Sequence, residues 1–480
     1  MGILSAPAVS NDPDKLSVRE KVGYGLGDTA ANFIFQTMLV FQTFFYTDVF
    51  GISPAEAGTL LLVARFWDAI FDPWMGVIAD RTNTRWGKFR PWILWTAIPF
   101  GVMGYLLFIT PDLSHQGKLV YAYVTYIVFM TVYSANNLPY SALSGVMTAD
   151  PAERTSLSSY RFVFAMLGGL AVKGLAPNMV TFFGRAYDAA GQVVTDPTTG
   201  EPLIDYARGY QWTMGIFSGL CIALFVITFL TTRERVHPDP TQTSSLLKDF
   251  GGLWANGPWK SIFAVTLLVF IALAMRGSIL QYYFKYYLRR PDAFWLFLVA
   301  GQLANIAGIF FSKPLALRFG KRNVLGAGLV GTSLFYAAFF MLPADDVGPA
   351  FIVETIGSLV YGVTIPLLWA MMADVADYSE WTSGYRATGV IFAAIVFALK
   401  AGLGVGGALT GWLLSFYGYD ENLAQQSAEA LRGIRLTSSV YPAAAFLIGV
   451  AILCFYRIDR QREHEIHSDL VERRKGFAKT

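Results

Sequence analysis

The sequence predicts an all-α membrane protein whose twelve transmembrane helices form two pseudo-symmetric six-helix bundles. Three observations lead to this fold class: an apolar composition, twelve separate apolar runs, and a basic cluster that recurs at the same place in each half. Hydrophobic residues make up 54% of the 480 residues and charged residues 15%, with a mean hydropathy of +0.44. Soluble domains carry roughly 25% charged residues, so this chain has too few for an ordinary water-facing surface. The 15% of aromatic residues also excludes a disordered chain.

Each of the twelve runs is long enough to cross a bilayer, which takes about 20 mostly apolar residues in a helix. None shows the alternation, over about ten residues, of an outer-membrane β-strand. The first, fourth and seventh runs carry polar residues in mid-span and fit the pattern of a membrane span least well. In chain order the runs are 22–47, 57–79, 91–110, 119–142, 160–183, 212–231, 261–287, 293–312, 323–343, 349–373, 388–415 and 437–456.

The chain divides at its longest charged connection, which has six spans on either side. The second span of each half runs into a basic cluster, Arg85–Arg90 in the first half and Lys313–Arg322 in the second. Repeats of this kind place a substrate site between the halves near mid-membrane. The predicted N-terminal arm, first bundle, linker, second bundle and tail are 1–21, 22–232, 233–260, 261–456 and 457–480.

Lysine and arginine are concentrated in the loops on the side of the two termini. Since positively charged loops stay in the cytoplasm, both termini are expected to be cytoplasmic. The first twenty residues show no charged segment followed by an apolar one, so no cleavable signal is expected. We expect a multi-pass protein of a bacterial-type inner membrane that acts as a monomer. The net charge of +3 gives no indication of a nucleic-acid partner. The basic residues of the opposite loops are Lys118, Arg185, Arg208, Arg289, Arg290, Arg432 and Arg435.

Two acidic residues in the second span are the sharpest candidate for a functional site. Asp68 and Asp72 are four residues apart, so their carboxylates lie on one helix face. Two such charges cannot both stay bare in a low dielectric, so they must share a proton, recruit a basic partner or bind a cation. Carboxylate oxygens suit a hard cation such as Na+, which makes this pair the candidate metal site. The structural alternative is a buried ion pair with Arg65 or Lys400, and Lys400 is the one charge of the eleventh span.

Two further spans carry dense polar groups. Asp28, Asn32 and Gln36 form a stripe on the first span, which suits the hydroxyl groups of a sugar or hydrogen bonds between helices. In the fourth span, Tyr133 to Ser141 forms a second polar patch that contains a proline. The backbone groups that proline frees need a cavity or polar neighbours. Arg161 opens the fifth span as a loop residue or a buried donor.

The seventh span combines Arg276 with a run of tyrosines around Lys285. A guanidinium at this place could hold an anionic group through two hydrogen bonds. Alternatively, the tyrosines form an aromatic belt at the membrane surface and Lys285 reaches out to the headgroups. No phosphate-binding loop, catalytic constellation or thiol metal site is evident, so we expect neither an enzyme nor a bound cofactor.

These motifs resemble the glycoside–pentoside–hexuronide:cation symporters, melibiose-permease-like members of the major facilitator superfamily. The resemblance runs from about Lys21 to Tyr456 and is most specific in the second span. The matching stretches are Tyr46–Asp48, Arg65–Gly76, Asp80–Thr82, Arg85–Trp92, Asn137–Tyr140 and Asp374–Tyr378.

The resemblance implies a major facilitator fold and symport of a sugar or glycoside with Na+ or H+. It implies that the cation-holding acidic pair falls on Asp68 and Asp72 and that the family's helix-11 lysine falls on Lys400. We expect Ser134, from the polar patch of the fourth span, to belong to the same cation site. The same resemblance puts sugar-binding residues of the first and fifth helices at Asp28 and Arg161. With the polar groups described above, the expected substrate contacts are Asp28, Asn32, Tyr133, Asn137, Arg161, Arg276 and Lys400.

Two positions depart from the family pattern. Asn137 stands where melibiose-type members have a sugar-binding acid, which argues against galactosides and, together with Arg276, favours an anionic hexuronide or glycuronide. Phe71 precedes the second acid where sodium-using members carry a polar residue, which leaves H+ beside Na+ as the coupling ion.

Transport is expected to proceed by alternating access, with a cytoplasmic gate formed by Asp80, Arg81 and Arg85. We expect this loop to pair with Asp150 or Glu153. Two other functions fit parts of the sequence: a symporter or exchanger for a non-sugar organic anion, and a transporter-like sugar sensor, although no long signalling domain is present.

Overall fold

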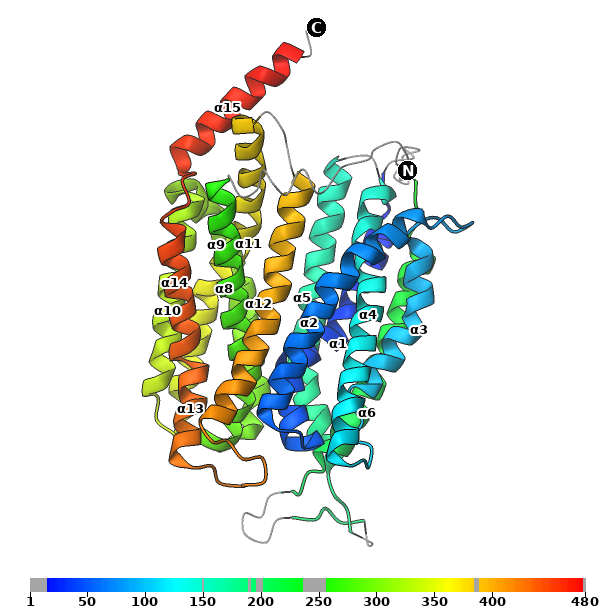
Figure 1. The fold of residues 1–480 in the computed structure, drawn as a ribbon, viewed down its shortest axis with the longest axis vertical. Helices are drawn as coiled ribbons and strands as arrows, with labels where there is room; N and C mark the ends of the chain where they lie inside the picture. The colour runs from blue at the N-terminus through cyan, green and yellow to red at the C-terminus, as the bar shows by residue number, and fades with distance from the viewer. Residues whose placement is uncertain are drawn as a thin grey trace, which may run out of the picture.

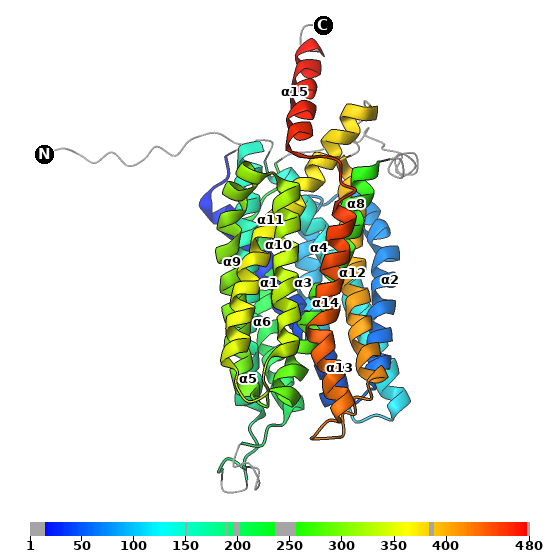
Figure 2. The ribbon, with the colours of Figure 1, turned by 90° about the vertical axis from the view of Figure 1, so that its left-hand side faces the viewer.

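The protein is described by a computed structural model for residues 15–148, 151–188, 191–195, 202–235, 256–383 and 388–477. Long helices run side by side in two groups, and each predicted span coincides with a helix (Figure 1). Helix α15 stands beyond the end of α14 (Figure 2). We call the end that carries the start of α1 and α15 the terminal end, and the other the distal end.

The first group comprises α1 (Val18–Phe44), η1 (Phe45–Phe50), α2 (Pro54–Arg81), α3 (Arg90–Leu106), α4 (His115–Met147), α5 (Pro151–Gly184) and α6 (Tyr206–Thr231). The second comprises α8 (Gly257–Tyr282), η2 (Tyr283–Tyr287), η3 (Pro291–Ala293), α9 (Phe294–Phe319), α10 (Lys321–Ala338), η4 (Phe339–Met341), α11 (Gly348–Ser383), α12 (Thr388–Phe416), α13 (Ala428–Ser438), α14 (Val440–Leu453) and α15 (Arg460–Phe477).

Several helices begin at side-chain caps that the sequence supplies. Ser17 and Ser53 each accept a hydrogen bond from the backbone of a glutamate three residues on, and each glutamate returns one, which forms a capping box at α1 and α2. Ser114, Asp205 and Asn256 cap α4, α6 and α8 in the simpler way.

Nine helices of the described residues are long and apolar enough to cross a membrane by length and composition. Helices α1, α2 and α3 do not reach that standard. Helix α2 carries charges in its interior, and α3 is only 17 residues long. These three helices nevertheless complete the six-helix arrangement of the first group.

The predicted twelfth span, 437–456, corresponds to α14, and a second helix, α13, precedes it on the other side of a break. Ser439 separates α13 from α14 and has a non-helical backbone (φ −129°, ψ −77°). Pro442 has no N–H to donate to the carbonyl of Ser438 four residues earlier, so the helix breaks there. The segment before the break, expected as a loop, forms α13.

Within the first group, α1 packs on α5 and α6, and α3 packs on α4 and α6. Within the second, α8 packs on α12 and α14, and α11 on α9 and α10. Three pairs join the groups: α2 with α12, α5 with α9, and α1 with α8. The α2–α12 pair converges at the distal end and separates toward the terminal end (Figure 1).

Small residues allow the close approach of α2 and α12 near the distal end. A Cβ added to Gly411 would lie 2.2 Å from the carbonyl oxygen of Pro54, and one added to Gly58 would lie 2.7 Å from that of Ala408. Contacts this short leave no room for any side chain. The close contact between α2 and α12, which we call the seam, therefore requires glycine at both places.

The buried apolar side chains form two clusters that divide the molecule unevenly. One contains the core of the first group and continues into the distal parts of the second, through residues such as Tyr282, Phe297 and Leu414. The other lies within the second group, around Val324, Met371 and Tyr456. The two groups thus share a core at the distal end only.

Candidate functional site

The acidic pair on α2 meets Lys400 from α12 at the interface between the two groups. The ammonium of Lys400 bonds Oδ2 of Asp72 and lies 3.7 Å from Oδ2 of Asp68. Nη1 of Arg65 lies 3.4 Å from the same Asp68 oxygen. The carboxylate partner expected for Lys400 is therefore present. Two cations balance two carboxylates, and this meets the condition for burying such charges.

The cluster also presents oxygen atoms that could hold a cation. Oδ1 of Asp72 is buried and accepts no hydrogen bond from the described residues. Ser134 on α4 donates to Oδ1 of Asp68 over 3.1 Å, which places the hydroxyl oxygen beside the pair. The ring of Phe71 stacks on that of Trp67. The available ligands are thus carboxylate and hydroxyl oxygens, which suit a proton or a hard cation.

The polar stripe of α1 is continuous and is anchored to α5. Arg161 Nε donates to Oδ2 of Asp28 over 3.0 Å, and its guanidinium lies 5.2 Å from the centre of the Tyr140 ring. The amide of Gln36 donates to Asn32, and that of Asn32 donates to the Asp28 carbonyl. This arrangement offers paired donors and acceptors along one helix face.

Helix α4 connects the stripe to the acidic cluster. Tyr133 stacks on Phe35 of α1, with ring centres 5.8 Å apart, while its neighbour Ser134 contacts Asp68. Asn137 is half-buried, one turn further along α4, and its amide makes no hydrogen bond to the described residues. A ligand that moves Tyr133 or Asn137 would therefore act on the helix that also holds Asp68.

Arg276 lies elsewhere, inside the second group. It is 3% exposed, forms an ion pair with Glu354 of α11 and lies between the rings of Tyr336 and Phe339. Its Nη1 donates to the carbonyl of Ser438 that Pro442 leaves without a partner. The structure therefore does not bring Arg276 to the predicted substrate site: its two terminal nitrogens contact protein groups within the second group, while its buried Nε has no partner among the described residues.

The predicted gate at the terminal end is only partly visible. Arg81 and Arg85 are exposed, and Arg85 stacks on Trp86. The side chain of Asp80 and the whole of Asp150 lie outside the described parts. Glu153 contacts Lys21 at 2.9 Å instead of the loop. The expected pairing of Glu153 with the loop is therefore not the contact seen.

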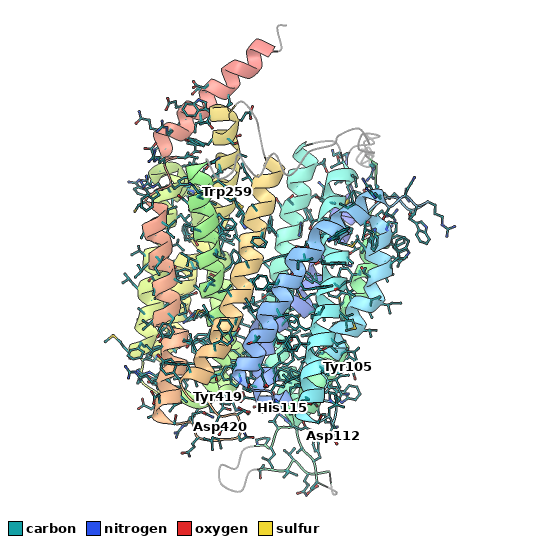
Figure 3. The ribbon with its side chains drawn as sticks, viewed as in Figure 1. Tyr105, Asp112, His115, Trp259, Tyr419 and Asp420 are labelled. Atoms are coloured by element: carbon teal, nitrogen blue, oxygen red, sulfur yellow. The ribbon has the colours of Figure 1, made fainter. Side chains whose placement is uncertain are left out.

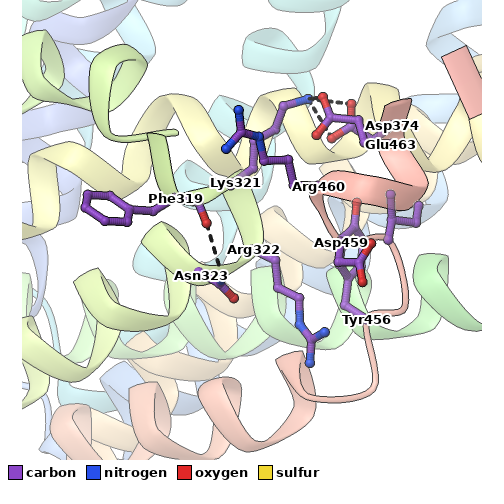
Figure 4. Close-up of a pocket in the computed structure, with 11 residues that line it drawn as sticks. Phe319, Lys321, Arg322, Asn323, Asp374, Tyr456, Asp459, Arg460 and Glu463 are labelled. Atoms are coloured by element: carbon purple, nitrogen blue, oxygen red, sulfur yellow. Dashed lines mark hydrogen bonds and ion pairs between the residues drawn. The ribbon is translucent and has the colours of Figure 1, made fainter. Parts of the chain in front are cut away.

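The loop after the second helix of each group is instead held by an acid that follows its sixth span. Glu234 accepts backbone hydrogen bonds from Lys88, Phe89 and Arg90 at 2.7–2.8 Å. In the second group, Lys321 contacts Asp374 at 2.6 Å and Glu463 of α15 at 3.0 Å, beside a small pocket (Figure 4).

A charged cluster at the distal end ties the two groups together. The carboxylate of Asp48 in η1 contacts Lys285 Nζ at 2.7 Å and the hydroxyl of Tyr419 at 2.7 Å, and it also accepts from Tyr286. Thr47 bonds Tyr282 across the same boundary. Tyr419 lies at the opposite end of the bundle from Trp259 (Figure 3). We call Asp48, Lys285, Tyr286 and Tyr419 the distal latch.

Sequence reasoning missed the distal latch and Glu354. Asp48 belongs to a matching motif without an assigned role, and the sequence pattern gives Lys285 no carboxylate partner. Glu354 is an acid inside a predicted span. The rule that intramembrane charges need partners would have paired it with one of the buried cations.

The sequence of the chain is similar to those of known proteins over nearly its whole length. Residues 23–460 match a family described as "MFS/sugar transport protein". The chain is 37% identical over 460 residues to a putative glycoside/cation symporter, YagG, of Escherichia coli, with 96% of each chain covered. It is 34% identical to an isoprimeverose transporter of Lactiplantibacillus pentosus (92% of this chain, 89% of that one). It is 32% identical to a glucuronide carrier protein homolog of E. coli (96% and 97%).

Proposed function

This chain belongs to the MFS/sugar transport family and to its glycoside–pentoside–hexuronide group, and from that premise we propose that it is a symporter. Its cargo would be a sugar or glycoside, carried inward with Na+ or H+. The membership itself makes the chain a multi-pass membrane transporter and not an enzyme. The relatives carry different cargoes by name, a glycoside, isoprimeverose and a glucuronide, so the family alone does not select the sugar.

The observation that carries the proposal is the cluster of Asp68, Asp72 and Lys400 at the interface between the groups. Its charges balance without a bound ion, and one carboxylate oxygen of Asp72 has no partner among the described residues. A coupling cation can take the place of the Lys400 ammonium against Asp72. Lys400 then becomes a free donor at the substrate side, so that loading the cation prepares the site for sugar.

Helix α4 would transmit this change to the sugar. Ser134 contacts Asp68, and Tyr133 contacts α1, where Asp28, paired with Arg161 of α5, supplies polar groups for hydroxyls. Cation and sugar would thus both act on the position of α4. Each ligand strengthens the binding of the other by the same factor, as linkage requires.

The contacts between the groups support an inward-facing state. If the basic loops lie in the cytoplasm, the terminal end is the inner one and the distal latch seals the outer side. The shared apolar core at the distal end agrees with this state. Release of Asp48 from Lys285 would accompany the change to the outward-facing state.

The test is charge displacement and uptake in proteoliposomes, with a sugar and glycoside panel, at two pH values and with or without Na+. We expect wild-type currents that depend on Na+ or on pH. Asp72→Asn should bind the sugar but fail to accumulate it against a gradient, and Arg161→Gln should lose binding. Silence of the wild type across the panel, with currents evoked by non-sugar organic anions, would overturn the proposal.

A further inference from the structure

We propose that Lys173 on α5 is a specificity-determining residue that recognises an anionic group on the outer unit of a two-unit glycoside. The inference rests on the proposed function and adds the charge and length of its cargo. It begins from the basic residues of the membrane-spanning segments. In the described structure, five of them each contact a carboxylate: Arg65, Arg161, Arg276, Lys285 and Lys400.

Lys173 is the exception among these residues. Its ammonium donates to the neutral amide oxygen of Gln302 over 2.6 Å, and no described carboxylate lies within ion-pair distance. Glu354 is near enough to attract it, but Glu354 already forms an ion pair with Arg276. The positive charge of Lys173 is therefore not balanced, and an unbalanced charge inside a membrane protein is costly. A bound anion would supply the missing charge.

The position of Lys173 on α5 directs it to the interior between the groups. It follows Gly169 by four residues, a spacing that puts both on one helix face. Gly169 faces the Gln36 side chain of the α1 stripe. The exposed side chain of Leu175 is two residues on and so points to the other side of the helix. Lys173 thus lies beside the polar stripe rather than toward lipid.

The second group contacts Lys173 through a polar side chain. Gln302 lies across the boundary on α9, and its amide oxygen accepts a hydrogen bond from the ammonium. Both groups therefore contribute to this polar region, as expected of a transporter site.

The separation along α5 indicates the length of the cargo. Arg161 and Lys173 are twelve residues apart, or about 18 Å along the helix axis. A single sugar ring cannot contact both side chains. A disaccharide-like molecule with one unit on Asp28 and Arg161 could extend its second unit past Gln36 toward Lys173. A carboxylate or sulfonate on that unit would pair with the ammonium.

The experiment measures equilibrium binding and uptake for matched pairs of disaccharides, of which cellobiouronic acid and cellobiose are one. The members of a pair differ only in a carboxylate against a hydroxymethyl group, and the panel varies the linkage. The wild type should prefer the acid. Lys173→Met should weaken acid binding about 10- to 100-fold, the size of a lost charge-assisted hydrogen bond, and change neutral binding less than about threefold.

Two controls separate recognition from structural support. Lys173→Arg should keep the preference for the acid, and Lys313→Met, which removes an exposed lysine of α9, should leave both affinities unchanged. Equal losses for acid and neutral sugar, or only a lower melting temperature, would show that Lys173 merely braces Gln302. A wild type that prefers the neutral member would also refute the inference. Silence toward both members of every pair would refute the proposed symport itself.

Discussion

At the scale of single residues, Arg276 shows how one side chain can support a helix break. Pro442 leaves the Ser438 carbonyl without its helical donor, and Arg276 supplies a replacement while it pairs with Glu354. Two buried groups in a low dielectric thus depend on one guanidinium. This accounts for an arginine inside a membrane helix without any ligand.

Replacing Arg276 with methionine should therefore lower stability and leave substrate affinity nearly unchanged. The substitution leaves Glu354 charged and unpaired, and breaking a buried pair in this way costs about 3–5 kcal/mol. The double variant Arg276→Met/Glu354→Gln should recover part of that loss. Thermal unfolding in detergent and sugar titration measure the two quantities. A large loss of affinity at unchanged melting temperature would instead restore Arg276 as a substrate ligand.

The sequence predicted the partner of a charged residue where that charge stands alone in its span. Lys400 was expected to meet Asp68 or Asp72 because a lone charge in a span requires a carboxylate. The same reasoning failed for Arg276, because Glu354 is distant in the chain and the freed Ser438 carbonyl belongs to a break that hydropathy does not reveal. The roles of Asp28, Asn137 and Ser134 in binding remain predictions.

At the scale of elements, the distal latch and the α2–α12 seam decide whether the groups stay together. The latch joins η1 to η2 and to the end of α12 through one carboxylate with three donors. The seam relies on backbones that nearly touch. One is electrostatic and the other steric, so they can be weakened separately.

Asp48→Asn should open the distal end more often. Loss of the charge leaves Lys285 without its carboxylate and weakens the closed state. A cysteine in place of buried Leu414, with Cys221→Ala and Cys454→Ser, should then react with a membrane-impermeant maleimide about tenfold faster, which corresponds to about 1.4 kcal/mol. Asp292→Asn, which removes an exposed surface pair with Arg290, is the matched control. Equal maleimide reactivity of the cysteine-bearing parent, its Asp48→Asn variant and its Asp292→Asn variant would refute the role of the distal latch.

Gly411→Ala should slow transport by about tenfold or more. The added Cβ would lie 2.2 Å from the Pro54 carbonyl, so α2 and α12 must separate at the distal end. Gly449→Ala is the control, since no atom lies within 4 Å of its added Cβ. Initial uptake rates, normalised to protein in the membrane, compare the two. An unaffected Gly411→Ala protein would mean that the seam does not need its close contact.

At the scale of the whole molecule, the twelve-helix fold followed from the sequence because each span is a separate, mostly apolar run in the chain. The break at Ser439 and the helical tail α15 did not follow, since both depend on contacts with other parts of the chain. The sequence also could not predict which end of the molecule is closed, because a transporter that works by alternating access adopts two arrangements with one sequence.

The charge of the cargo should be readable from the response of the transporter to voltage. One charge moved across 100 mV gains about 2.3 kcal/mol, enough for roughly 50-fold accumulation. A neutral glycoside carried with one cation should respond in that way, whereas a monoanionic glycoside carried with one cation moves no net charge. Uptake driven by a potassium diffusion potential, with no ion gradient for the coupling cation, distinguishes them. Voltage-driven accumulation of the acid would require a second cation.

The π-helical turns η1 and η2 end the first helix of each group. A π turn holds one more residue than an α turn, and each residue of an α-helix adds about 100° of rotation. The extra residue therefore changes the direction, about the helix axis, in which all later side chains point. Removing one residue from η1 would swing Asp48 by about a quarter turn away from Lys285, without altering any side chain. The winding of η1 and η2, and not only the choice of side chains, therefore places Asp48 opposite Lys285.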